Sequence, residues 1–191
     1  MKLPTKRILV ICVVFWLFSI SLGQTRPALP PTLGLDQGFI DLDTPDFKLR
    51  LVKASQTVAA LEPKSTPGFD FTPADRLSQR EADRYHHLGD LILRLRIGGS
   101  GPWQKFDTAD ARKPVAPITP TGPTLAAADL SPTLPNDIPL QVGRSWLVKN
   151  GRLILRFDLR NKTSQPVEVG GLGIPMIFNN MITGRNLKEA H

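Results

Sequence analysis

Alternation of apolar and polar residues dominates this chain and predicts β-strands. Aliphatic residues occupy every second position from Leu91 to Ile97, and two arginines fall among the residues between them. In an extended chain the aliphatic row lies on one face and the guanidinium groups lie on the other. A similar alternation from Phe47 to Leu51, with Thr57–Leu61 as its partner, predicts two more strands. No stretch keeps a 3.6-residue apolar period for long, so the pattern favours a mostly β fold.

The clearest predicted element is a β-hairpin from Val142 to Arg160. Two alternating runs flank Asn150-Gly151, the dipeptide that most readily adopts positive φ at both central positions of a type I′ turn. One face of the hairpin is apolar apart from Arg144, which needs carbonyl or carboxylate partners because an unpaired buried charge is prohibitive. A two-residue turn predicts the following cross-strand pairs: Lys149 with Arg152, Val148 with Leu153, Trp146 with Leu155, Arg144 with Phe157, and Val142 with Leu159.

Prolines are frequent in the middle of the chain. Eight of them lie between Gly98 and Leu140, a spacing that excludes a long helix or a central strand, so we expect a long irregular connection over 98–140. Within it, Thr124–Leu130 is predicted to make one helical turn, and a second helix is expected from Thr72 through Arg84. The segment Asn161–Gln165 reads as a turn that leads into a further extended stretch.

The N-terminus has the organisation of a secretory signal peptide. Three basic residues precede an uncharged apolar run from Ile8 to Leu22, and Ser21-Leu22-Gly23 supplies small residues where a signal peptidase cuts. We therefore predict cleavage after Gly23 and a secreted, extracellular protein. A membrane span needs about 20 apolar residues, and the Pro-rich leader over 24–34 begins too early for a stable membrane anchor. The alternative is an uncleaved signal anchor.

Composition limits the remainder to one domain over 35–191. The chain has 191 residues, 41% of them hydrophobic and 21% charged, which is globular and excludes a large multidomain enzyme. The net charge of +7 overstates the basicity of the mature chain, because Lys2, Lys6 and Arg7 belong to the signal segment. The single cysteine, Cys12, lies there too, so no disulfide or thiol chemistry is available to the mature domain.

Neither a metal site nor a catalytic pair emerges from the ionisable residues, and we assign no cofactor. His86 and His87 are adjacent, so in a strand they point to opposite faces and cannot chelate one ion. Glycoside hydrolysis commonly needs two carboxylates that flank one bond. The acidic residues instead fall in two loop clusters that we expect to be solvated: Asp36, Asp41, Asp43 and Asp46, and then Asp70, Asp75, Asp83 and Asp90.

Two surface features remain for an exported protein. The strand cations Lys48, Arg50, Arg94 and Arg96 are expected on a solvated face rather than on nucleic acid, because export removes that partner and aromatic residues are sparse. Asn161-Lys162-Thr163 is a glycosylation sequon at a predicted turn.

Trp103 and Trp146 are the aromatic candidates for contact with a sugar. An aromatic ring binds sugars by burying their CH faces. Trp146 shares the apolar face of the hairpin with Leu155 and is expected in the core, whereas Trp103 follows Gly101-Pro102 on a loop and is the candidate for sugar contact.

The C-terminal stretch Gly170–Phe178 is apolar and glycine-rich although few residues follow it. Isolated domains normally avoid an exposed apolar patch or an unpaired strand edge. We therefore expect this end to pack against a partner domain or another chain through Ile174, Met176, Ile177 and Phe178.

Four segments together resemble the opening of secreted fungal proteins described as six-hairpin glycosidase-like. These segments are Asp43-Thr44-Pro45-Asp46-Phe47-Lys48-Leu49, Gly68-Phe69-Asp70-Phe71-Thr72-Pro73, His87-Leu88-Gly89-Asp90-Leu91 and Gly170-Gly171-Leu172-Gly173-Ile174-Pro175-Met176. The resemblance spans roughly 35–191. It implies an antiparallel β-sandwich of the mutarotase-like supersandwich type, followed in such proteins by a larger helical toroid that would carry the chemistry, with carbohydrate as the substrate class. It brings no catalytic motif to this region.

The sequence thus predicts a non-catalytic N-terminal β-sandwich accessory domain of a secreted carbohydrate-active protein, without its helical C-terminal partner. The alternative is a self-sufficient secreted carbohydrate-binding module that uses Trp103. A third class, a complete enzyme, needs converging carboxylates that the sequence does not place. An exposed Trp103 with a covered 174–178 segment would favour the binding module, and the opposite arrangement favours the accessory domain.

Overall fold

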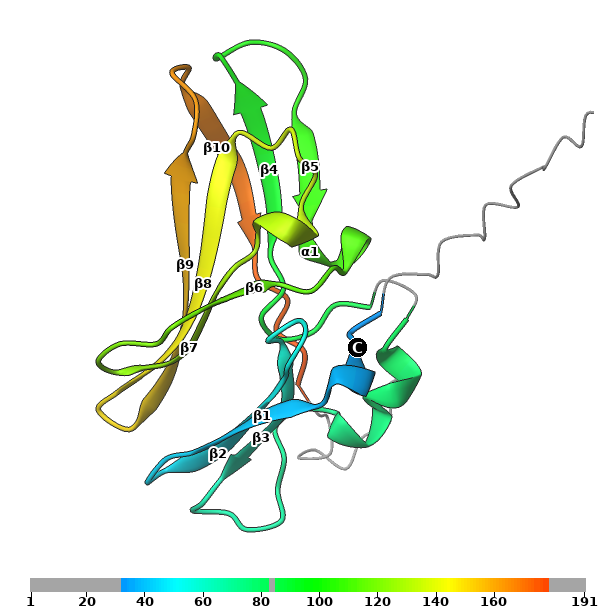
Figure 1. Ribbon diagram of the computed structural model, residues 1–191, viewed down its shortest axis with the longest axis vertical. Helices are drawn as coiled ribbons and strands as arrows, with labels where there is room; N and C mark the ends of the chain where they lie inside the picture. Colours follow the sequence, from blue (N-terminus) through cyan, green and yellow to red (C-terminus); the bar gives the residue numbers. More distant parts are fainter. Residues whose placement is uncertain (1–31, 83–84, 179–191) are drawn as a thin grey trace, which may run out of the picture.

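The computed structural model describes residues 32–82 and 85–178, and these form an all-β, sandwich-like fold of three antiparallel sheets (Figure 1). The predicted signal peptide, its cleavage site after Gly23 and most of the predicted leader lie outside the described residues. The strands are β1 Phe39–Asp43, β2 Phe47–Val52, β3 Val58–Pro63, β4 Ile92–Ile97, β5 Gln104–Asp107, β6 Ala116–Ile118, β7 Thr124–Asp129, β8 Leu140–Lys149, β9 Arg152–Asn161 and β10 Val167–Gly173. The helical turns are η1 Leu35–Gln37, η2 Ala74–Arg76, η3 Ser78–Arg80, α1 Thr108–Ala111 and η4 Ser131–Thr133.

The three sheets have simple orders. One sheet is β1-β2-β3, the second is β10-β4-β5, and the third is β6-β7-β8-β9. The long β8–β9 hairpin runs almost the full height of the molecule, with β4 and β10 beside its upper half and β1–β3 beside its lower half (Figure 1). Its apolar face therefore packs against both of these sheets.

Two hydrophobic cores lie along that face. The upper core joins β4 to the hairpin through Leu91, Leu93, Leu95, Leu140 and Val142 among others. The lower core joins β2 to it through Phe47, Leu49, Leu51, Val58 and Trp146 among others. Trp146 is 1% exposed, which confirms its prediction as a core residue.

The predicted hairpin is confirmed down to its register. Lys149 pairs with Arg152, and all five predicted cross-strand pairs are present. Asn150 and Gly151 both have positive φ, at 52° and 71°, as the type I′ turn requires. The turn and the alternation acted together here, since the turn sets the register and the apolar row selects the buried face.

The expected irregular connection over 98–140 is wrong in part. It contains β5, α1, β6 and β7. The predicted helical turn at Thr124–Leu130 is also wrong, because Thr124–Asp129 forms β7 between β6 and β8. No proline falls between Pro123 and Pro132, so this window can supply an inner strand, and tertiary packing overrides the helical propensity of its alanines.

Other predictions differ from the structure at the level of single elements. β1, which pairs with β2, was not predicted. The helix expected from Thr72 to Arg84 is two short 3₁₀ turns, η2 and η3, within its described part. Pro117 lies in β6, the edge strand of its sheet, where a missing N–H donor costs no ladder hydrogen bond.

Candidate functional site

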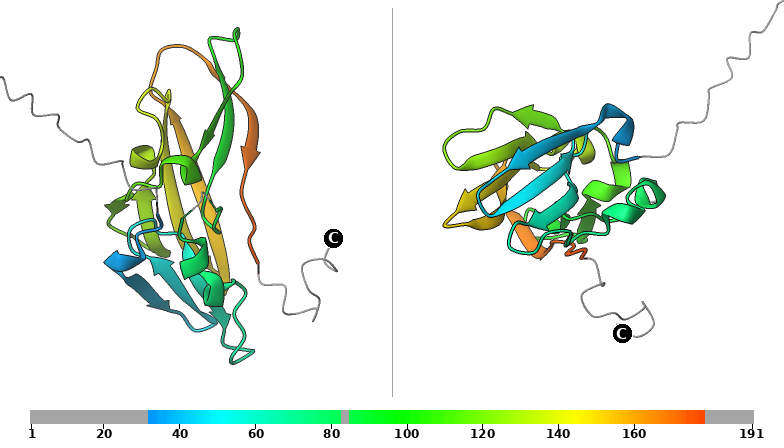
Figure 2. Two further views of the ribbon diagram at one scale, coloured as in Figure 1. Left: turned by 90° about the vertical axis from the view of Figure 1, so that its right-hand side faces the viewer. Right: turned by 90° about the horizontal axis from the view of Figure 1, so that it is seen from below.

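The strand β10 and the five residues after it form an apolar margin of the molecule. We call these five residues, 174–178, the exit segment. Figure 2 shows β10 and the chain that follows it, orange to red, along the outer margin of the molecule. Met176 is 59% exposed, Phe178 49% and Ile174 37%. These apolar side chains, predicted to contact a partner, are therefore open to solvent on the described chain.

Part of this apolar surface belongs to β10 itself. Val169 pairs with Leu95 and Leu172 pairs with Leu93, and paired residues of an antiparallel ladder share a face. Leu93 and Leu95 are each 1% exposed, whereas Val169 and Leu172 are 50% and 49% exposed. The inner face of the sheet is thus covered at β4 and uncovered at β10.

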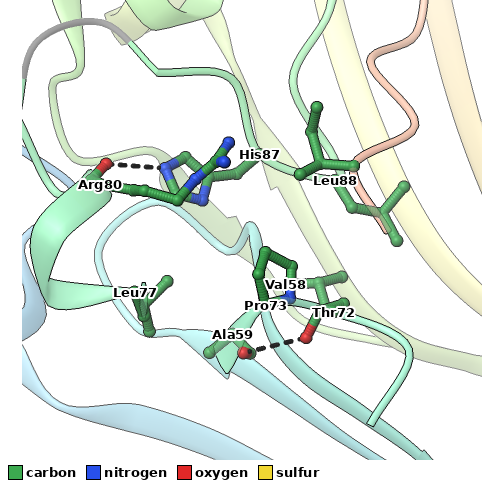
Figure 3. A pocket seen from close by; sticks show the side chains of 9 residues that line it. Val58, Ala59, Thr72, Pro73, Leu77, Arg80, His87 and Leu88 are labelled. Carbon is green, nitrogen blue, oxygen red and sulfur yellow. Dashed lines mark hydrogen bonds between the residues drawn. The ribbon is translucent and has the colours of Figure 1, made fainter. Parts of the chain in front are cut away.

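Ile177 behaves differently from its neighbours in the exit segment. It is half-buried and lines a small pocket between β3, the η2–η3 turns and the chain before β4. Figure 3 shows this pocket, whose other lining residues are Val58, Ala59, Thr72, Pro73, Leu77, Arg80, His87 and Leu88. Ile177 therefore places the exit segment against the lower half of the molecule, and its predicted contact with a partner remains a prediction.

Hydrogen bonds give that pocket a defined shape. The Thr72 hydroxyl donates to the carbonyl of Ala59 at 3.2 Å, and the ring Nε2 of His87 bonds to the carbonyl of Arg80 at 3.0 Å (Figure 3). Burial, followed by the charge of Arg112, lowers the pKa of His87 to about 4. His87 is therefore neutral at pH 7, and its Nε2–H is the donor to Arg80.

Trp103, the predicted sugar contact, is half-buried, and three residues of β4 and β10 lie against its ring. A Cβ added at Gly170 would lie 2.5 Å from its ring, so the ring rests directly on that backbone. The guanidinium carbons of Arg94 and Arg96 lie 5.3 and 4.7 Å from the ring centroid, within cation–π range. Arg96 also forms an ion pair with Glu168. Trp103 therefore packs against both β10 and β4, which leaves only part of its ring exposed.

Arg144 lies where the upper and lower cores meet, between Val142 and Trp146. Its Nη1 donates to the carbonyl of Gly89 at 2.6 Å, and its Nη2 donates to the carbonyl of Ser55. These partners are of the type that the sequence predicted for a buried arginine. Arg144 is 2% exposed, and burial lowers its pKa to about 10, so it remains charged at neutral pH.

A second buried cation lies beside Arg144. Arg112, 8% exposed, forms a two-point ion pair with Asp90, in which Nη1 reaches Oδ1 at 2.7 Å and Nη2 reaches Oδ2 at 2.8 Å. The hydroxyl of Thr108 also donates to Asp90 at 2.9 Å. The prediction that Asp90 is a solvated loop acid is therefore wrong: it is 1% exposed. Its partner is 22 residues away on the far side of β5, and no local pattern connects them.

The two adjacent histidines have separate partners. The His86 ring bonds to Asp107 at 2.9 Å, whereas His87 faces Arg80. Burial opposes ionisation of Asp107, but hydrogen bonds from His86 and from the N–H of Ala109 outweigh it and lower the pKa of Asp107. Within 32–82 and 85–178, no group of three or more His, Cys, Asp or Glu residues gathers as metal ligands would.

Acidic residues near β1 form cross-strand pairs on the surface. Asp41 pairs with Arg50 and Asp43 pairs with Lys64, each at 2.6 Å, and these hydrogen bonds lower the pKa of both carboxyls. Lys48, Arg50 and Arg94 are exposed, as a solvated strand face requires. Asn161 is exposed at the end of β9, where its side-chain amide donates to the carbonyl of Gln165.

Comparison with known proteins places the chain in a family. The DUF5695 family, described as a family of unknown function, matches residues 50–191. The chain belongs to this family. The match begins within β2 and includes the upper core, most of the lower core, the buried arginines and the exit segment. No curated protein and no solved structure matches the chain. None of the helices within the described residues is long and apolar enough to cross a membrane.

Proposed function

We propose that this member of the DUF5695 family is an exported, non-catalytic β-sandwich accessory domain of a carbohydrate-active protein. The proposal assigns the chemistry to a helical domain that follows it in a longer product or is supplied by another chain. Its resemblance to secreted six-hairpin glycosidase-like proteins supports the carbohydrate class, and the signal-peptide pattern supports export.

One observation supports the proposal that a partner domain docks on the exit segment. The exit segment is anchored through Ile177 while Ile174, Met176 and Phe178 on either side of it are exposed. An anchored segment presents these side chains at fixed positions, so a partner that buries them loses little additional chain entropy. Complete burial of a fully exposed side chain of this size is worth about 1.5–3 kcal/mol, and these three side chains, which are already partly covered, would each gain a fraction of that on docking.

The arrangement of Trp103 weighs against the carbohydrate-binding module. That alternative needs a free aromatic face and a covered exit segment. Instead, Gly170, Arg94 and Arg96 pack against the half-buried Trp103 ring, and Ile174, Met176 and Phe178 of the exit segment are exposed. Both conditions favour the accessory domain.

Two measurements on the secreted chain separate these functions. The accessory domain predicts no release of reducing ends from a polysaccharide panel and no change in tryptophan fluorescence on titration with the same glycans. Hydrolysis that persists through purification would overturn the accessory assignment in favour of a complete enzyme. A saturable fluorescence change that is lost in Trp103→Ala would establish the binding module instead.

A further inference from the structure

The outer edge of β9 is open for pairing. β9 is the terminal strand of its sheet, and its inner edge pairs with β8 along its whole length. The type I′ turn bonds the carbonyl of Lys149 to the N–H of Arg152, so the even-numbered residues of β9 direct their backbone groups toward β8. The odd-numbered residues from 153 to 161 then direct their backbone N–H and C=O groups away from β8, toward the open edge of the sheet. In the described chain no hydrogen bond joins the backbone of 153, 155, 157 or 159 to another element.

The core-facing side chains of β9 are incompletely covered. Leu155, Phe157 and Leu159 pair with buried residues of β8, and Leu153 pairs with the half-buried Val148, yet all four remain half-buried. The apolar face therefore continues past the last strand of the sheet. A strand added at the open edge of β9 would extend the hydrogen-bonded ladder and would also cover this row of apolar side chains.

We propose that two copies of this chain pair through antiparallel β9 strands, with the two-fold axis at Phe157. In this register Phe157 faces Phe157 of the second copy, and Leu155 faces Leu159 of the second copy in both directions. These are the odd-numbered positions whose backbone groups point outward, so each pair can exchange N–H···O=C bonds. The two sheets would join into one continuous sheet, a self-complementary contact of the kind that two-fold dimers use.

Charge on the outer face favours this register over the two adjacent ones. Arg156 falls opposite Asp158 of the second copy, and the reverse pair forms at the same time. These positions are the closely spaced, non-hydrogen-bonded pairs of the ladder, where opposite charges stabilise and like charges destabilise. A shift of the ladder by one pair in one direction places Arg156 opposite itself, and in the other direction it places Asp158 opposite itself.

Charged residues on an edge strand normally prevent such pairing. On the outer face of β9, however, the charges alternate in sign. The side chains of Arg156 and Asp158 are neighbours on that face, are 61% and 53% exposed, and form an ion pair within one chain. In the dimer, two ion pairs between the copies replace the one internal ion pair of each copy, so the total number of ion pairs stays the same. Asn161, the sequon residue, lies at the outer limit of the ladder, so a glycan there would leave the central pairs in place.

The dimer surface is separate from the exit segment, and its failure would leave the proposed function untouched. The test measures the mass of the full chain by sedimentation equilibrium, up to about 100 μM, for wild type, Arg156→Asp, Asp158→Arg and the double swap. Lys48→Glu, an exposed charge reversal on β2, is the matched control. Thermal unfolding verifies that every variant is folded.

Wild type, Lys48→Glu and the double swap are expected to dimerise, whereas each single variant raises the dissociation constant at least tenfold. An equimolar mixture of Arg156→Asp and Asp158→Arg should recover the dimer, because opposite charges then face each other at both places. A monomeric wild type at the highest concentration, or single variants that dimerise as wild type does, would overturn the proposal. So would a dimer that persists in both single variants but is lost in Met176→Ser/Phe178→Ser.

Discussion

Arg144 joins two parts of the chain that have no strand pairing between them. Its guanidinium group binds the carbonyl before β4 and the carbonyl in the β2–β3 turn, at the level where the upper and lower cores meet. The sequence allowed the partner type to be predicted, because a charge in an otherwise apolar row must find buried acceptors. It did not identify the two carbonyls, which belong to loops of irregular backbone.

Replacement of Arg144 by methionine is expected to reduce the free energy of unfolding by about 2–4 kcal/mol, because two buried carbonyl groups lose their donors. The relief of burying a charge offsets part of that loss. Urea unfolding followed by fluorescence measures the change. Arg50→Met, whose ion pair with Asp41 is exposed, should change stability by no more than about 1 kcal/mol. Equal effects of the two variants would contradict the buried role of Arg144.

His87 gives the fold a defined pH dependence. Its pKa is about 4 in the folded chain and 6.5 without perturbation, so protonation favours the unfolded chain. The stability that neutral His87 contributes is fully present above pH 6.5 and is lost as the pH falls to about 4, a loss of roughly 3 kcal/mol. The lowered carboxyl pKa values, such as that of Asp107, act below this window.

The expected result is a wild-type free energy of unfolding that falls between pH 6.5 and pH 4, and a flatter profile for His87→Gln. Denaturant titration at four or five pH values measures both slopes. If the two proteins show the same slope, the loss arises from other groups and the buried, neutral state of His87 is wrong.

At the scale of elements, Gly170 determines how β10 meets Trp103. A Cβ at Gly170 would lie 2.5 Å from the ring, whereas a Cβ at Gly171 would meet its nearest neighbour, the Cβ of Arg94, at 3.6 Å. Gly170→Ala is therefore expected to displace the ring from β10 and to cost about 1–3 kcal/mol, with Gly171→Ala much closer to neutral. A red-shifted Trp103 emission in Gly170→Ala would accompany the loss. Indistinguishable spectra and stabilities of the two variants would contradict this packing.

Elements were predictable where one local rule determined both their type and their pairing. Asn150-Gly151 fixed the turn, and the turn fixed the register of β8 and β9. β7 was missed because Ala126, Ala127 and Ala128 carry no strand signal of their own, and they become a strand through their position between β6 and β8. The Asp90–Arg112 pair was missed for the same reason at a longer range, since only the folded chain brings α1 beside the start of β4.

At the scale of the whole molecule, the β8–β9 hairpin connects the two hydrophobic cores into one fold. The upper core uses one end of its apolar face and the lower core uses the other, which is why the sandwich holds without a disulfide in the described chain. The exit segment leaves the upper sheet at β10 and is anchored in the lower half by Ile177. It therefore connects the two parts of the molecule, and the proposed partner would contact a surface that runs between them.

We propose that the exit segment is an anchored surface for a partner and is not part of the core. Binding of a hydrophobic fluorescent dye by the purified chain, compared with the variant Ile174→Ser/Met176→Ser/Phe178→Ser, tests it most directly, with Ile177→Ser as the control for the anchored position. We expect the triple variant to bind clearly less dye than wild type at an unchanged thermal midpoint, whereas Ile177→Ser lowers that midpoint. Unchanged dye binding, or a collapse of the midpoint in the triple variant, would contradict it.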